Sequence, residues 1–195
     1  MVTPRRTFLA FLLLSAGALA AGEPRASGVP NFHQVDEHVY RGAQPTPEGL
    51  KSLAKMGIKT IIDLRGGGDH TTWEQSAVEA LGMHYVHIPL RGMSAPSDED
   101  VAKALALLDS PTASSYWPVF VHCKRGKDRT GTVIACYRIE HDHWRNEKAL
   151  DEARLHGMSR IEWAMMSYVL RYRPPAQATA SSKPPSPPPQ LPGTK

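Results

Sequence analysis

The chain has 195 residues, 41% of them hydrophobic and 22% charged, which suits one globular domain with its own core. The formal net charge is +4, but between residues 28 and 173 the basic and acidic residues balance at 18 each. A neutral domain argues against a nucleic-acid binder, which normally presents a basic face, so we expect no nucleic-acid partner.

Residues 1–20 predict a cleaved signal peptide. Arg5 and Arg6 precede an apolar run at residues 8–14, and Ala18-Leu19-Ala20 has the small residues of a cleavage site. The run is shorter than the roughly 20 residues that span a bilayer, so no stable membrane span is expected after cleavage. The arginine pair also resembles a twin-arginine export signal. We therefore expect a periplasmic or secreted protein.

Residues 21–30 are expected to form an unstructured lead-in to a domain at residues 31–173. The hydrophobic pattern of this domain predicts strands that alternate with helices. Strands are expected at residues 35–41, 59–64, 83–90 and 119–122. Helices are expected at residues 46–56 with Thr46 as the N-cap, at 71–81, from Ser97 onward, and at 132–144, 146–156 and 159–172.

This order of elements predicts an α/β fold in which helices flank a mainly parallel central sheet of roughly four to five strands. In the last helix, apolar side chains recur at helical spacing, and we interpret them as core residues: Ile161, Ala164, Met165, Tyr168 and Tyr172. Residues 174–195 contain eight prolines among 22 residues and predict a disordered tail.

The most informative run is residues 122–131, which read HCKRGKDRTG. It lies between the expected strand and the start of a helix, where unpaired backbone N–H groups and the helix dipole favour an anion. The same field favours the thiolate form of a cysteine. Cys123 is therefore the candidate nucleophile, and the run predicts a loop that binds phosphate while a thiolate attacks it.

Each residue type in the run has a physical role. Gly126 and Gly131 allow the backbone to curl so that its N–H groups converge. The planar guanidinium of Arg129 can bind two phosphate oxygens at once. The hydroxyl of Thr130 could donate to the leaving thiolate, and the ring of His122 could orient the backbone of the cysteine. Further phosphates could be met by the remaining cations of the loop, Lys124, Arg125 and Lys127.

This run resembles the signature of the cysteine-dependent phosphatases, specifically the dual-specificity branch. Residues 39–46 (VYRGAQPT) and 50–65 (LKSLAKMGIKTIIDLR) resemble the opening of the plant, fungal and bacterial atypical dual-specificity phosphatases. The resemblance covers residues 31–172. It implies a three-layer fold like that of the dual-specificity phosphatases, and metal-independent hydrolysis through a phosphocysteine without a cofactor. The structural alternative is a glycine-rich turn that holds a buried cysteine.

The proton donor for the leaving group is the main departure from this pattern. In most dual-specificity phosphatases an Asp about thirty residues before the cysteine is the acid, but residues 89–96 (PLRGMSAP) contain no carboxylate. Asp98 follows shortly, although its place at a helix start explains it structurally. Asp128 lies within the loop, as in the myotubularin lipid phosphatases. Two readings of Asp128 stay open: it is the acid, or it pairs with Arg129, Arg65 or Lys127.

The lysines of the loop are also similar to those of the phosphoinositide-phosphatase tumour suppressor, and related plant and fungal enzymes act on inositol pyrophosphates. These resemblances imply a phosphorylated partner: an anionic small molecule, a lipid headgroup or a phosphopeptide. A non-catalytic phosphate-recognition module is the alternative that the missing upstream Asp favours. A sulfur-transfer enzyme fits poorly with Arg129 and Thr130.

The other candidate ligands and cysteine are interpreted structurally. Cys136 lies about two turns into the next helix, too far for a disulfide with Cys123, and is expected in the core. His141 and His143 are expected at a solvated helix end, because no third ligand lies nearby. We therefore predict no metal site.

Overall fold

The computed structural model describes residues 25–66, 72–109 and 115–175. The predicted signal peptide and residues 176–195 of the predicted tail lie outside these ranges. The described strands form one five-stranded sheet in the order β1-β2-β5-β3-β4. They are β1 (His33–Gln34), β2 (Val39–Ala43), β3 (Thr60–Arg65), β4 (His84–Leu90) and β5 (Val119–Cys123). Strand β1 is antiparallel and the other pairs are parallel, which confirms the predicted mainly parallel sheet.

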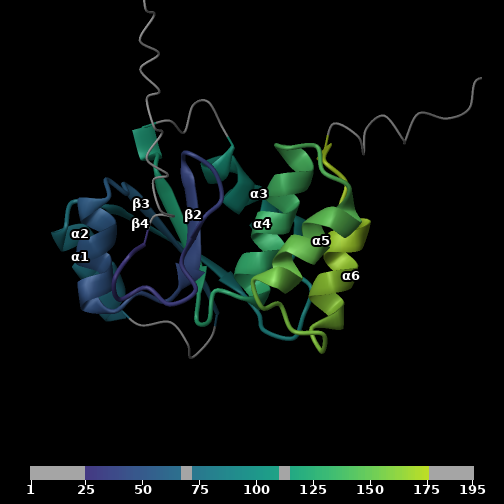
Figure 1. Ribbon diagram of the computed structural model, residues 1–195, viewed down its shortest axis with the longest axis horizontal. Helices are drawn as coiled ribbons and strands as arrows, with labels where there is room; N and C mark the ends of the chain where they lie inside the picture. The colour runs from purple at the N-terminus through teal and green to yellow at the C-terminus, as the bar shows by residue number, and fades with distance from the viewer. Residues whose placement is uncertain (1–24, 67–71, 110–114, 176–195) are drawn as a thin grey trace, which may run out of the picture.

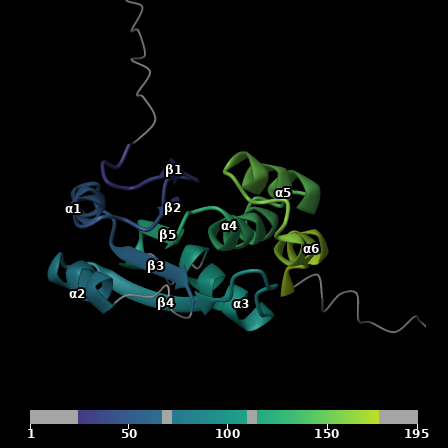
Figure 2. The same ribbon diagram turned by 90° about the horizontal axis from the view of Figure 1, so that it is seen from below.

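Helices cover both faces of the sheet (Figures 1 and 2). On one face lie α1 (Pro47–Lys55) and α2 (Thr72–Ala80), and on the other lie α3 (Asp98–Leu108) and α4 (Asp128–Glu140). Two further helices, α5 (Asn146–Leu155) and α6 (Trp163–Arg171), pack against α4. The molecule therefore has the predicted three layers, with an additional helical pair outside α4.

Alternation along the strands supplies a core on each face of the sheet. Ile61 of β3 packs in the cluster beneath α1, whereas its neighbour Ile62 packs in the cluster beneath α3 and α4. Cys136 is fully buried in the second cluster, and burial raises the pKa of its thiol. Both cysteines are free, so the predicted core role of Cys136 is confirmed.

Helices α1 and α3 start within one residue of the predicted position, and Thr46 is the N-cap that the sequence predicts. The hydroxyls of Thr46 and Ser97 accept hydrogen bonds from the backbone N–H of Gly49 and Asp100, each at 3.1 Å. The strand predicted at residues 35–41 instead lies at Val39–Ala43. The carboxylate of Asp36 accepts hydrogen bonds from the backbone N–H groups of His38 and Val39, and the chain turns there before β2.

Four other expectations differ from the structure. Helix α4 starts at Asp128 and not at residue 132, so part of the signature run forms its first turn. Helix α6 starts at Trp163 and not at residue 159, and Ile161, predicted in the core, is 69% exposed. In the expected lead-in, Ala26 and Val29 are buried against the α1 side of the sheet.

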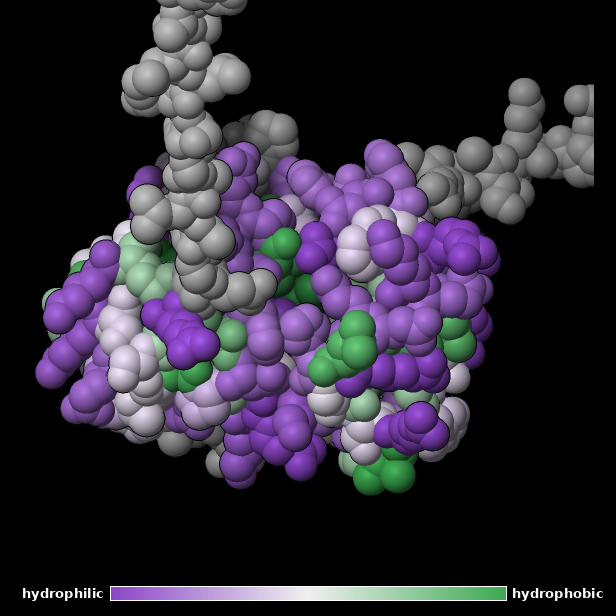
Figure 3. Space-filling model, in the orientation of Figure 1, coloured by the Kyte–Doolittle hydropathy of each residue, from purple (hydrophilic) through white to green (hydrophobic). Residues whose placement is uncertain are grey.

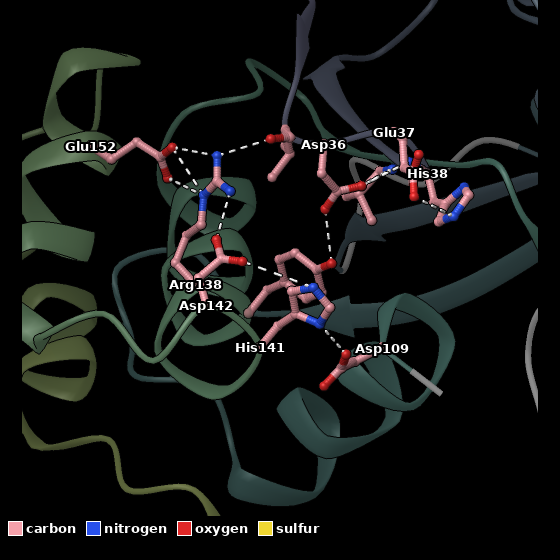
Figure 4. Close-up of polar contacts among 11 residues, drawn as sticks. Asp36, Glu37, His38, Asp109, Arg138, His141, Asp142 and Glu152 are labelled. Carbon is pink, nitrogen blue, oxygen red and sulfur yellow. Dashed lines mark hydrogen bonds and ion pairs between the residues drawn. The ribbon is translucent and has the colours of Figure 1, made fainter. Parts of the chain in front are cut away.

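The end of α4 far from the loop is held by Arg138 (Figure 4). Its guanidinium pairs with Glu152 at 2.9 Å and Asp142 at 2.7 Å, and donates to the carbonyl of Val35 at 3.0 Å. These contacts join α4 to α5 and to the turn before β2. They hold α4 in place, and the first turn of this helix contains the end of the signature run.

The face of the domain seen in Figure 3 is largely hydrophilic, with hydrophobic side chains in small separate patches. Across the described part of the chain, every helix is too short or too polar to cross a membrane.

Candidate active site

The loop between β5 and α4 brings the signature residues together. Cys123, which is buried, ends β5, and residues 124–127 connect it to the first residue of α4. Gly126 has a φ of +67°, and a Cβ atom there would lie 2.3 Å from the carbonyl carbon of Gly42. Only glycine fits this close approach between the loop and β2.

Two side chains from the N-terminal part of the domain support the loop. Nδ2 of Asn31 and Nη2 of Arg41 both donate to the carbonyl oxygen of Gly126, at 2.9 and 3.1 Å. A trans peptide places its N–H opposite its C=O, so the next amide N–H points away from these supports. Burial lowers the pKa of Arg41 to about 10, while the charges of Glu152 and Cys123 oppose the shift. Arg41 is thus a charged support at neutral pH, one that sequence reasoning missed.

The first turn of α4 supplies the other donors. The side chain of Lys127, the N-cap, makes no capping hydrogen bond in the part of the chain that the structure describes. The backbone N–H of Gly131 donates to the carbonyl of Lys127 at 2.7 Å. The N–H groups before Gly131 therefore stand at the positive end of the helix without partners inside it, the arrangement of an anion site.

A cavity of about 200 Å³ lies at this loop. Its lining comes from the β4–α3 segment, the signature run and the chain around the start of α6: Gly92, Met93, Cys123, Arg125, Asp128, Arg129, Glu162 and Met165. The segment at residues 89–96 thus forms one wall, through a glycine and a methionine. The nucleophile and the arginine that the sequence predicts share the cavity.

Asp128 is a buried residue of the cavity lining, and both of its carboxylate oxygens accept hydrogen bonds. The backbone N–H of Ser159 donates to Oδ1 at 2.8 Å, and Nη2 of Arg125 donates to Oδ2 at 3.2 Å. These contacts match the pairing interpretation of Asp128, with Arg125 as the cation in place of the three that the sequence suggested. Both oxygens of Asp128 are therefore already engaged by protein donors.

The remaining predicted residues of the loop differ in exposure. Lys124, Arg125 and Lys127 are exposed and Arg129 is half-buried. Thr130 is fully buried, and its hydroxyl has no hydrogen-bond partner among the described residues. The loop therefore presents Lys124 and Lys127 at the surface, whereas Arg125 and Arg129 both line the cavity.

Behind the cysteine lies a buried polar cluster. Nδ1 of His122 is 3.4 Å from the carbonyl oxygen of Cys123, and Nε2 is 3.1 Å from a carboxylate oxygen of Glu74. Arg65 lies between two acids, with Nη2 at 2.7 Å from Asp63 and 2.5 Å from Glu74. This cluster connects β3 and α2 to the backbone of the nucleophile.

The cluster has the composition of a metal site but is already occupied by a cation. Ligand atoms of Asp63, Glu74 and His122 lie within 4.8 Å of one another. The guanidinium of Arg65 binds both carboxylates, and the hydroxyl of Tyr85 donates to Asp63 at 2.6 Å. Burial alone would raise the pKa of Asp63, but the hydrogen bonds from Arg65 hold it well below its usual range. The two carboxylates therefore bind the guanidinium of Arg65 in place of a metal ion.

The other candidate acid of the sequence lies elsewhere. Asp98 opens α3, accepts a hydrogen bond from the hydroxyl of Tyr168 at 2.8 Å, and lines a separate groove with Tyr168 and Tyr172. Its place at a helix start agrees with the structural interpretation.

Sequence reasoning missed Glu162 on the cavity wall. The residue is 6% exposed, yet it was absorbed into a helix predicted from residue 159. Gly157 is the signal that could have indicated this. A glycine just after a helix commonly ends it, and Gly157 has a φ of +94° after α5, so the residues that follow could have been predicted as a turn.

Comparisons with known proteins agree with this geometry. Residues 24–169 match the family described as "DSP-PTPase phosphatase fused to NAD+ Kinase". The chain is similar to the dual specificity protein phosphatase TpbA of Pseudomonas aeruginosa, with 30% identity over 160 residues, covering 76% of this chain and 67% of that protein. It is 33% identical over 124 residues to the phosphatidylglycerophosphate phosphatase PTPMT2 of Arabidopsis thaliana, covering 63% and 54% of the two chains.

A solved structure shares the fold. The catalytic core of the PP-IP phosphatase SIW14 of S. cerevisiae, in complex with citrate, superimposes with a TM-score of 0.66 at 21% identity. The match covers 81% of this chain and 94% of that one.

Proposed function

The chain belongs to the DSP-type family of cysteine-dependent phosphatases, and we propose that it hydrolyses phosphate monoesters or anhydrides through a phosphocysteine on Cys123. The observation that carries this proposal is the placement of Cys123 and Arg129 in one cavity beside the uncapped start of α4. A thiolate there is stabilised by the positive end of the helix. Its target phosphoryl group would accept hydrogen bonds from the amides and from the guanidinium.

The chemical steps follow from this arrangement. The thiolate attacks phosphorus in line with the leaving oxygen, the S–P bond forms and the P–O bond breaks. Arg129 and the amides bind the equatorial oxygens in the transition state. The buried hydroxyl of Thr130 is our candidate donor to the sulfur when water later releases phosphate.

The substrate that we propose is a highly anionic phosphorylated molecule of the inositol phosphate or phosphoinositide type, with phosphotyrosine as a second candidate. The exposed cations Lys124, Arg125 and Lys127 support the first class, because they place positive charge on the loop that contains the nucleophile. The names of SIW14 and PTPMT2, which act on a PP-IP and on a phosphorylated lipid, point the same way. The dual-specificity name of TpbA supports the second candidate.

We further propose an exported location, periplasmic or secreted, on the strength of residues 1–20 alone. The prediction is tested by whether the mature protein starts near residue 21 after expression with its full N-terminus.

Phosphate release tests the proposed function. Wild type should release phosphate from phosphotyrosine peptides, phosphoinositides, inositol phosphates or pyrophosphates, and Cys123→Ser should release none. Arg129→Lys should lose most of the rate, because an ammonium cannot bind two phosphate oxygens in a planar fork. Binding of phosphorylated ligands without release by wild type would instead favour a recognition module.

A further inference from the structure

Glu162 is a buried carboxyl group in the wall of the cavity that holds Cys123 and Arg129. Its two neighbours in the chain are large and apolar, and both are exposed: Ile161 at 69% and Trp163 at 71%. The segment therefore turns its charged residue inward and its apolar residues outward, the reverse of the usual preference. Such an inversion needs a reason in the surroundings of Glu162.

Local structure does not supply that reason. The sequence from Ser159 to Glu162 has the Ser-x-x-Glu spacing of a capping box, in which the glutamate would accept from the serine backbone N–H. That N–H instead donates to Asp128, at 2.8 Å. Glu162 is itself the N-cap of α6, and its side chain makes no capping hydrogen bond. Its buried Oε2 accepts no hydrogen bond from any residue that the structure describes.

A buried oxygen without a partner costs free energy unless the carboxyl group is neutral or receives a ligand. Met93 and Met165 also line the cavity and give part of it an apolar character. A phosphate bound at Arg129 would bring at least one negative charge into the same small cavity. The side chain of Glu162 lines that same cavity, so it would lie beside the bound phosphate.

From this geometry we infer that Glu162 is the general acid of the proposed phosphatase reaction, a role that rests on the proposed function of Cys123. As the S–P bond forms and the P–O bond breaks, the electron pair stays on the leaving oxygen, which takes the proton of Glu162. A water molecule then attacks phosphorus and gives its proton to the Glu162 carboxylate. The S–P bond breaks, inorganic phosphate forms, and Cys123 returns to the thiolate.

The two carboxyl groups that the sequence suggested, Asp128 and Asp98, fit this role less well. Asp128 lines the cavity, but both of its oxygens already accept hydrogen bonds. Asp98 lines a separate groove and accepts from Tyr168. Glu162 combines a place in the cavity with a buried oxygen that has no partner in the described structure.

The test compares phenyl phosphate with p-nitrophenyl phosphate, which differ in how much the leaving oxygen needs a proton. kcat/KM reports the steps up to departure of that oxygen. In Glu162→Gln we expect kcat/KM to fall by about 100-fold or more on phenyl phosphate, within the range for a lost general acid. The loss on p-nitrophenyl phosphate should be at least ten times smaller. Inhibition by inorganic phosphate and the unfolding temperature should stay close to wild type.

Two control variants separate the possible failures. Asp128→Asn should lower kcat/KM equally on both substrates, because Asp128 only braces the cavity. A loss that depends on the leaving group in Asp128→Asn and not in Glu162→Gln would overturn the inference. Equal losses on both substrates in Glu162→Gln would do so too. Activity that persists in Cys123→Ser would instead refute the proposed function, whatever Glu162 does.

Discussion

The backbone N–H of Ser159 donates a hydrogen bond of 2.8 Å to Oδ1 of Asp128, which lies 31 positions earlier in the chain. This bond joins the first turn of α4 to the segment between α5 and α6. It fixes the two cavity walls that carry Arg129 and Glu162 relative to each other, and it removes the N–H that Glu162 would otherwise cap. The site thus depends on a contact between two segments that no local pattern relates.

Replacing Asp128 tests this brace. Asp128→Ala leaves the N–H of Ser159 without its partner in a part-buried position, and we expect a loss of about 1–3 kcal/mol in the free energy of unfolding. Asp128→Asn keeps an acceptor oxygen for that N–H and should lose less. Chemical denaturation of the three proteins measures the difference. Equal stability of Asp128→Ala and wild type would show that the hydrogen bond does not hold the walls.

Gly126→Ala tests the shape of the loop. The positive φ costs about 1–2 kcal/mol for alanine, and the new Cβ atom would lie 2.3 Å from Gly42. Overpacking adds about 1–3 kcal/mol, so we expect both lower stability and loss of phosphate release. Gly57→Ala is the matched control, since Gly57 has a φ of +83° but open space around its Cβ position. The Gly57→Ala protein should lose only the stability that the positive φ costs and should keep its activity.

The buried acids behind the cysteine make a second prediction on stability. Glu74→Ala would leave Arg65 with one carboxylate and His122 without its neighbour, so the free energy of unfolding should fall by about 3–5 kcal/mol. Glu99→Ala is the comparison, because Glu99 pairs with Lys103 on the exposed surface of α3. That variant should be as stable as wild type. A small effect of Glu74→Ala would mean that the cluster is replaceable.

His156 predicts a pH dependence of stability. Burial, and then the charges of Arg41 and His33, lower the pKa of its imidazole from 6.5 to about 4. Between these pH values the unfolded chain binds a proton that the folded protein does not, so stability should fall as the pH drops from 6.5 toward 4. His156→Gln should flatten this part of a Tm-against-pH curve. An unaltered slope in His156→Gln would contradict the assignment.

Local signals were sufficient for much of the fold. Thr46 and Ser97 cap the helices that they predict, because the donors that they satisfy lie within three residues. The signature run likewise places Cys123 and Arg129 correctly in one cavity. These features depend on short stretches of chain, and periodicity and spacing describe such stretches well.

Contacts between distant segments could not be predicted in the same way. Ile161 fits an apolar helical pattern, but the chain is still turning at that position, and its side chain points to solvent. Arg41 is a charged residue of a type that is rarely buried, yet it is 1% exposed and its guanidinium donates to the carbonyl of Gly126. The capping box that Ser159 and Glu162 could form is likewise prevented by a hydrogen bond between segments 31 positions apart, from the N–H of Ser159 to Asp128.

The central claim is a covalent phosphoryl group on Cys123. The most direct measurement is mass spectrometry of enzyme quenched in acid during turnover of p-nitrophenyl phosphate, followed by peptide mapping. The account predicts one added phosphoryl group, located on the peptide that contains Cys123 and absent from Cys123→Ser. A phosphoryl group on another residue, or continued phosphate release by Cys123→Ser, would contradict it.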